Sequence, residues 1–199
     1  MTNSNKLFIL MMLTFTSYIF IENPHITIKL YLISAAFIAL YSILKKELNM
    51  LHISAFVISL CTIEYITIGF FDNFLKSSFS DKLTVAILYY TYQILFNIIG
   101  FFVFIFRVQI SRALSRSKEI KLTPFDNIIH WVFIYKFIVI SLHTIDYYIN
   151  SKHDISTLSF FYTYYEELIY FGMAAIITIL VCMAIYYEKE KINNEPKEV

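Results

Sequence analysis

The chain has 199 residues and a formal net charge of +1; 58% of its residues are hydrophobic and only 16% are charged. Soluble domains carry nearer a quarter charged residues, so this composition excludes an ordinary soluble globular domain. The charges gather in short clusters, and the apolar runs between them have about 15 to 25 residues, the length that crosses a hydrocarbon core of roughly 30 Å. We therefore predict an all-α integral membrane protein, a bundle of about six transmembrane helices.

Six apolar segments are predicted to cross the membrane within a single transmembrane domain, residues 1–199. In chain order they are residues 7–21, 26–44, 50–71, 83–106, 127–149 and 168–187. The first is similar to a signal peptide, because Lys6 precedes an apolar run. It ends in ENPH without a small-residue cleavage site, so we interpret it as a retained span.

Helix-start signals support two of these boundaries. Asn23 is a suitable cap for the second span, and Pro24 suits its first turn. Before the fifth span, Thr123 is a plausible cap, Pro124 the first helical residue and Asp126 an acid in the first turn. No predicted span contains a proline, so we expect straight, continuous helices.

Positive charge predicts the orientation of the bundle. Of the 16 lysines and arginines, eleven fall on one side, four on the other, and Lys136 lies inside the fifth span. The eleven are Lys6, Lys45, Lys46, Arg107, Arg112, Arg116, Lys118, Lys121, Lys189, Lys191 and Lys197, and the four are Lys29, Lys76, Lys82 and Lys152. Because lysine and arginine concentrate on the cytoplasmic side, both termini are predicted to be cytoplasmic, and the location is the bacterial inner membrane.

The fifth span contains three ionisable side chains in the stretch FIYKFIVISLHTIDYY, residues 133–148. At 100° per residue, His143 lies about 20° and Asp146 about 80° from Lys136 around the helix axis, so the three form one stripe. Charged groups inside a membrane normally face the bundle interior and find partners. The other polar candidates are Glu64 in the third span and Gln93 and Asn97 in the fourth.

These six residues are predicted to form one intramembrane polar cluster. They are Glu64, Gln93, Asn97, Lys136, His143 and Asp146. Three roles remain open. The cluster can hold the bundle together, it can be a ligand, ion or proton site, or it can contact a partner membrane helix.

A basic cytoplasmic loop, residues 107–126, links the fourth and fifth spans. Its candidate docking residues are Arg112, Arg116, Lys118 and Lys121. A basic amphipathic segment can bind anionic lipids or an acidic protein partner, whereas the simplest reading is a positive-inside signal with a solvated face. Because the loop has no stacking aromatic beyond Phe125, we predict no direct nucleic-acid binding. The polar tail, residues 188–199, is predicted to be disordered in isolation, with a contact strip for a soluble partner as the alternative.

The sequence lacks the common enzyme signatures, and we predict a non-enzymatic protein without cofactor or metal. Cys61 and Cys182 belong to no CxxC or Cys/His group, so no zinc site or disulfide is expected. The pair Glu166–Glu167 is similar to the EExxxR motif of intramembrane CAAX-type proteases. Here Phe171 occupies the arginine position, and no following helix supplies metal-binding histidines.

Size, six predicted spans, low glycine content and heavy use of Ile, Phe, Tyr and Asn resemble the small accessory membrane proteins of bacterial mobile elements. Within that group the chain resembles the membrane component of Kiwa-type anti-phage defence. The resemblance covers the whole chain as size and hydropathy, without a shared motif, so no residue role is transferred. It implies a multi-pass membrane subunit that oligomerises, senses envelope perturbation and works with a cytosolic effector.

Two alternatives remain. The first is a small oligomeric ion or proton channel or carrier in which the charges of the polar cluster form the path. The second is an immunity protein against a pore-forming colicin.

Overall fold

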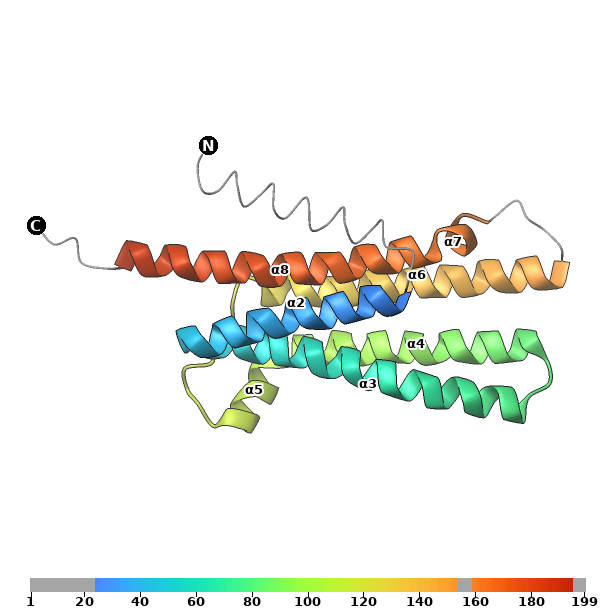
Figure 1. Cartoon of the computed structure of the whole chain (residues 1–199), viewed down its shortest axis with the longest axis horizontal. Coiled ribbons are helices and arrows are strands. Elements are labelled where there is room, and N and C mark those ends of the chain that lie inside the picture. The colour runs from blue at the N-terminus through green and yellow to red at the C-terminus, as the bar shows by residue number, and fades with distance from the viewer. Residues whose placement is uncertain (1–23, 154–158, 195–199) are drawn as a thin grey trace, which may run out of the picture.

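The computed structural model describes residues 24–153 and 159–194, and every regular element in these ranges is a helix. The helices in Figure 1 are α2 (Pro24–Lys45), α3 (Leu48–Ser78), α4 (Lys82–Ile105), α5 (Arg107–Ser115), α6 (Asp126–His153), α7 (Phe160–Thr163) and α8 (Tyr165–Asn194). The all-α prediction is confirmed for these residues. The first predicted span, residues 7–21, lies outside them.

Among the described helices, five are long and apolar enough to cross a membrane, namely α2, α3, α4, α6 and α8. Several continue beyond the predicted spans: α3 runs to Ser78 and α6 to His153. Hydropathy marks only the apolar part of a helix, whereas backbone hydrogen bonding continues into polar flanks. For the same reason α8 continues into the predicted polar tail and remains helical as far as Asn194.

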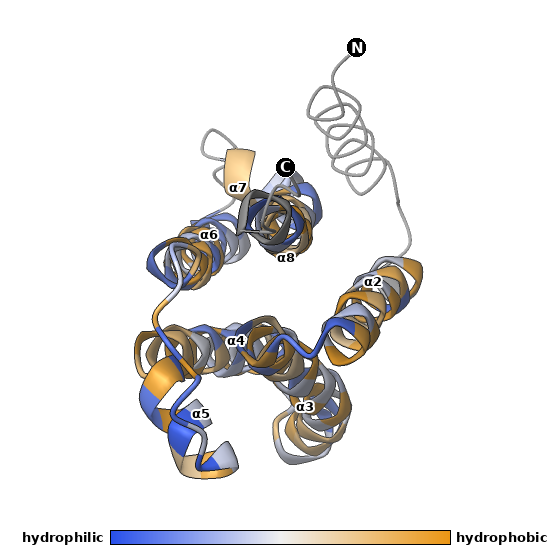
Figure 2. Cartoon of the chain, turned by 90° about the vertical axis from the view of Figure 1, so that its left-hand side faces the viewer, coloured by the Kyte–Doolittle hydropathy of each residue, from blue (hydrophilic) through white to orange (hydrophobic). Residues whose placement is uncertain are grey.

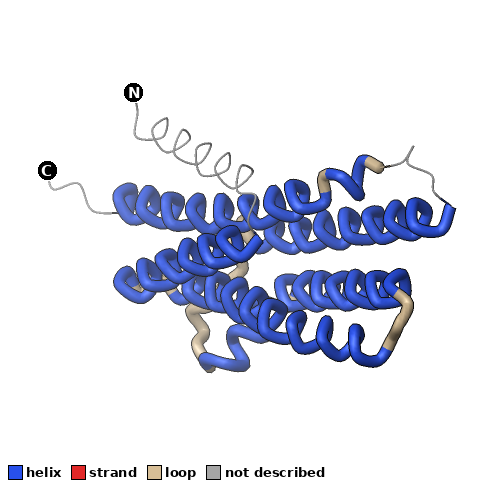
Figure 3. Tube along the Cα trace, turned by 45° about the vertical axis from the view of Figure 1, so that its right-hand side comes forward, coloured by secondary structure: helices blue, strands red, loops and turns tan. Residues whose placement is uncertain are grey.

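The five long helices form a ring in the order α2, α3, α4, α6, α8 and back to α2, and α3 also contacts α8. Figure 2 shows this ring from one end, with α6 and α8 on one side, α3 and α4 on the other, and α2 beside them. The helices run alongside one another, and the loops join their ends (Figure 3). A ring of this kind can enclose a space along its axis.

The outward faces of the ring are apolar. Large hydrophobic side chains are mostly exposed there, including Phe37, Phe70 and Trp131. Exposed apolar surface on this scale marks contact with a membrane or a partner, and it agrees with helices of membrane-spanning length. Inside the ring, Phe104, Ile129 and Leu180 are almost completely buried.

Helices α4 and α6 approach closely where Gly100 faces Phe133. A Cβ atom at position 100 would lie 2.3 Å from Phe133 Cδ1, so only glycine leaves room for this ring. The Phe133 ring stacks on Phe104 with 5.2 Å between the ring centroids. The missing side chain at position 100 therefore sets the spacing of α4 and α6.

Helix α6 begins at Asp126, later than the predicted start at Pro124. Asp126 Oδ2 accepts hydrogen bonds from Thr123 N at 2.6 Å and from Thr123 Oγ1 at 2.8 Å. The Asp126 amide in turn donates to the Thr123 carbonyl at 3.1 Å. Thr123 and Asp126 thus cap a turn that contains Pro124, and this turn replaces the predicted first helical turn.

A buried ion pair joins α5 to α6 at one end of the ring. Arg107 is 0% exposed and Asp126 is buried; Arg107 Nε donates to Asp126 Oδ1 at 2.6 Å, and its Nη2 contacts Asp126 Oδ2. Arg107 also donates to the Lys121 carbonyl at 2.9 Å and to Asn49 Oδ1 at 3.2 Å. The same Asn49 oxygen accepts from Lys121 N at 2.9 Å. This network ties the basic loop to α3, α5 and α6.

Candidate functional site

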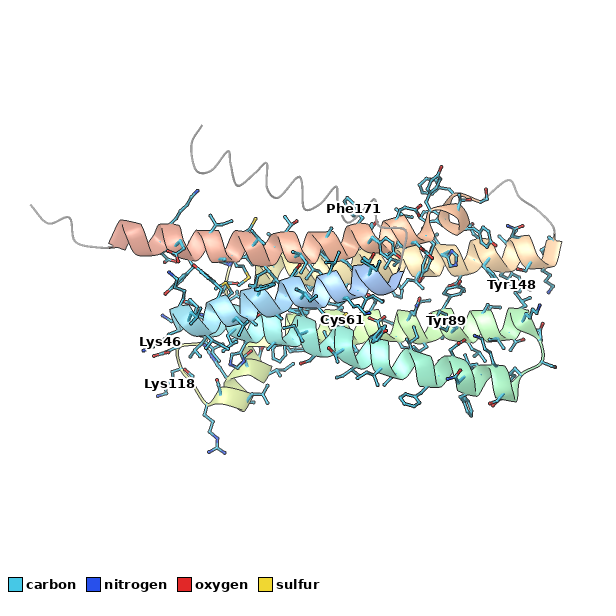
Figure 4. All side chains as sticks on the ribbon, in the orientation of Figure 1. Lys46, Cys61, Tyr89, Lys118, Tyr148 and Phe171 are labelled. Carbon is cyan, nitrogen blue, oxygen red and sulfur yellow. The ribbon has the colours of Figure 1, made fainter. Side chains whose placement is uncertain are left out.

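A cavity of about 420 Å³ lies inside the ring, and residues from all five long helices line it. Sites for small molecules typically have volumes of about 300–1,000 Å³. Figure 4 labels Cys61 and Tyr89 in the interior part of the bundle, between Lys46 and Lys118 at one end and Tyr148 at the other. The polar lining consists of Tyr31, Cys61, Glu64, Tyr65, Tyr89, Gln93, Asn97, Lys136, Tyr165, Glu166 and Tyr170.

Besides Glu166 of α8, whose Oε2 accepts from Tyr170 Oη at 3.2 Å, two opposite charges line this cavity, Glu64 from α3 and Lys136 from α6. Among the described residues, no salt bridge joins them and neither side chain has a hydrogen-bond partner. Lys136 Nζ lies 5.8 Å from the centroid of the Phe133 ring. Gly172 of α8 leaves room for the lysine stem, because a Cβ there would lie 3.0 Å from Lys136 Cγ.

The α4 wall supplies two amides, and Tyr165 fixes one of them. Tyr165 Oη donates to Gln93 Oε1 at 2.5 Å. Asn97 Nδ2 donates to the Gln93 carbonyl at 2.8 Å. Asn97 is 2% exposed, and its Oδ1 has no hydrogen-bond partner within the described part of the chain. A buried acceptor of this kind favours a donor from outside the protein.

The remaining two members of the predicted cluster, His143 and Asp146, do not line the cavity. Both hold α7 instead: the Phe161 carbonyl oxygen lies 3.1 Å from His143 Nδ1, and Phe161 N donates to Asp146 Oδ2 at 3.2 Å. The His143 ring stacks on Tyr165 with 4.1 Å between centroids. The single cluster therefore divides into a cavity group of four residues and a pair that anchors α7.

The predicted cluster omits several other residues of the cavity wall, among them Tyr165 and Cys61. Cys61 does share a helix face with Glu64, three residues later, so the helical period was a usable signal. Nothing in the sequence indicated that Tyr165 would reach across to Gln93 on α4.

The candidate docking residues lie on the outside of the loop, away from the cavity. Arg112, Arg116 and Lys118 line one shallow surface depression, and these side chains and that of Lys121 are exposed. Arg112 also has a structural contact, because its Nε donates to the Ile120 carbonyl at 2.9 Å. We refer to Arg112, Arg116, Lys118 and Lys121 as the basic surface.

A second cavity, of about 470 Å³, lies beside the loop and is lined by Glu47, Glu119, Glu190 and Lys121. Burial raises the pKa of Glu47 above its ordinary value of 4.5, and the Glu190 and Glu119 carboxylates raise it further. Protonation of Glu47 therefore stabilises the folded state at pH values below its ordinary pKa of 4.5. This stabilisation is lost as the pH rises through the raised pKa of the folded state.

We therefore expect Glu47→Gln to be more stable than the unchanged protein at pH 7, by less than about 1 kcal/mol. At pH 4 the two should be about equally stable, because Glu47 is then largely protonated. Unfolding midpoints in detergent at the two pH values measure this. Glu119→Gln should shift stability in the same direction by a smaller amount, and a Glu47→Gln variant less stable at pH 7 would contradict the assignment.

Within residues 24–153 and 159–194, no group of three or more His, Cys, Asp or Glu side chains is arranged to hold a metal ion. Comparisons with protein-family models, curated proteins and solved structures give no match to this chain. The features of the chain that bear on its function are therefore the cavity, the basic surface and the contacts between them.

Proposed function

We propose that this chain is a non-enzymatic, multi-pass subunit of the bacterial inner membrane that receives a signal in the cavity and holds a cytosolic effector at its basic surface, as part of a defence system. In this proposal the chain crosses the membrane six times, has both termini in the cytoplasm and oligomerises. The cluster of cations at the α5 end supports the assignment of that end to the cytoplasm.

The observation that carries the proposal is a physical connection from the cavity to the basic surface. Helix α6 carries Lys136 in the cavity wall and Asp126 at its start, about 15 Å away along the axis at 1.5 Å per residue. Asp126 pairs with Arg107, and Arg107 donates to the Lys121 carbonyl. A shift of α6 at the cavity is therefore transmitted to the loop that displays the basic surface.

The packing between the cavity and the α5 end favours a sensor over an ion path through one chain. Phe104, Ile129 and Leu180 are each at most 1% exposed and form an apolar layer inside the ring. A hydrated path for ions needs polar groups or water along its whole length.

A charge-reversal experiment tests the docking step. The tagged chain is purified from its native host in mild detergent, and the mass of the intact complex is measured. Arg116→Glu with Lys118→Glu should reduce the amount of bound soluble protein at least about ten-fold, since reversed charges repel a partner that complements the basic surface. Arg112 is left unchanged because of its contact with the Ile120 carbonyl.

The matched control reverses two exposed lysines at the opposite end of the bundle, Lys82→Glu with Lys152→Glu. This control should keep the partner. A complex that survives reversal of the basic surface, or a native preparation that contains no second protein, would contradict the proposed function.

A further inference from the structure

Two charged residues of the cavity wall, Glu64 and Lys136, have no salt-bridge or hydrogen-bond partner among the described residues, and this points to a bound ligand. In a low-dielectric interior, opposite charges are stable when they pair directly or when hydrogen bonds satisfy them. Glu64 and Lys136 line one cavity, yet in the described residues they form no salt bridge and have no hydrogen-bond partner. A bound molecule with one positive and one negative group would satisfy both.

A third polar group in the cavity wall, the Asn97 Oδ1 atom, also requires a hydrogen-bond donor. Asn97 Oδ1 is buried, lies in the same cavity wall and lacks a partner among the described residues. An ammonium group has three donors and can contact both a carboxylate and an amide oxygen. A carboxylate is the natural partner of the Lys136 ammonium.

Much of the remaining wall is apolar and includes Leu60, Phe96 and Ile140. Its other polar groups include two pairs that are already hydrogen-bonded, Tyr165 with Gln93 and Tyr170 with Glu166. If the cavity held only water, its apolar side chains would stay hydrated. The apolar part of an organic ligand would cover these side chains and exclude the water. An ion with one charge would leave either Glu64 or Lys136 without a partner.

We propose that the cavity binds a small zwitterion with an apolar body, its ammonium at Glu64 and Asn97 Oδ1 and its carboxylate at Lys136. The proposal deepens the proposed function, because it names the ligand class of the sensing cavity. It is tested on the isolated chain, so its failure is distinguishable from a failure of effector docking.

The experiment uses a native thiol in the cavity wall as the reporter. The full chain with Cys182→Ser keeps Cys61, and labelling of Cys61 by a water-soluble methanethiosulfonate is followed by mass spectrometry. The probes are leucine and phenylalanine, their amides, which keep only the ammonium, and their N-acetyl derivatives, which keep only the carboxylate. At least one free amino acid should protect Cys61, with an affinity at least about ten-fold higher than either of its one-charge derivatives.

Two variants test whether the ammonium end of the probe binds Glu64 and whether its carboxylate end binds Lys136. Glu64→Gln and Lys136→Met should each weaken protection at least about ten-fold. The matched controls, Asp72→Asn on α3 and Lys76→Met, remove a similar pair of charges that lies outside the cavity and should bind normally. If neither free amino acid protects Cys61, or if the one-charge derivatives protect it equally well, the proposal is overturned.

Discussion

Replacement of Arg107 by methionine is expected to destabilise the protein by about 3–5 kcal/mol, the largest effect of any single change considered for this chain. The guanidinium is completely buried and contacts Asp126, the Lys121 carbonyl and Asn49 Oδ1. Its removal leaves the Asp126 carboxylate buried, with Thr123 as its one side-chain partner among the residues that the structure describes. Unfolding of the purified protein in detergent, followed by circular dichroism and by the fluorescence of Trp131, measures the change.

Two further variants test whether the loss of stability comes from the buried pair of Arg107 and Asp126. Arg116→Met removes an exposed arginine near the end of α5 and should change stability by less than about 0.5 kcal/mol. Adding Asp126→Asn to Arg107→Met should recover part of the loss, because the unpaired charge is gone. Additive effects of the two substitutions would show that the ion pair is not energetically coupled.

Gly100→Ala is expected to destabilise the protein by about 1–3 kcal/mol, although alanine is the better helix former. The added Cβ would lie 2.3 Å from Phe133 Cδ1 and 2.4 Å from Phe133 Cε1, so α4 and α6 must separate or the ring must leave its stack on Phe104. The same unfolding assay measures the loss. Phe133→Leu in the Gly100→Ala background should restore part of the stability, since a smaller side chain gives the methyl group room.

Gly69 on α3 is the natural control, because no atom of the described part of the chain lies within 4 Å of the position its Cβ would take. Gly69→Ala should be neutral or stabilising by up to about 1 kcal/mol. Equal effects of the two alanine substitutions would contradict the close approach of α4 and α6 at Gly100.

The helices were predictable from sequence because long apolar runs have few alternatives in a membrane. The ends of the helices were less predictable, since polar flanks such as those of α3 and α8 carry no hydropathy signal. Arg107 illustrates the main limit of prediction from sequence, which is the burial of a charged side chain. Its charge placed it correctly in a basic cluster, but its burial depends on Asn49 and Asp126, which are distant in sequence and meet only in the folded ring.

The cavity could be anticipated in part. Glu64, Gln93, Asn97 and Lys136 were singled out because polar groups in apolar spans seek the bundle interior, and all four line the cavity. His143 and Asp146 satisfy the same rule, but α7 folds back onto α6 and takes their hydrogen bonds. The position of that short helix depends on packing against α6, which the local sequence does not encode.

The most direct test of the account is a cross-linking measurement between positions 64 and 136. With Cys61 and Cys182 replaced by serine, Glu64→Cys and Lys136→Cys are combined, and a short bifunctional methanethiosulfonate is applied to the folded protein. If Glu64 and Lys136 line one cavity, cross-linking within one chain should be efficient. It should be much weaker when the second cysteine is at Ile138, an exposed position on α6, the helix that carries Lys136. If positions 64 and 136 fail to cross-link while each cysteine reacts singly, Glu64 and Lys136 do not share a cavity.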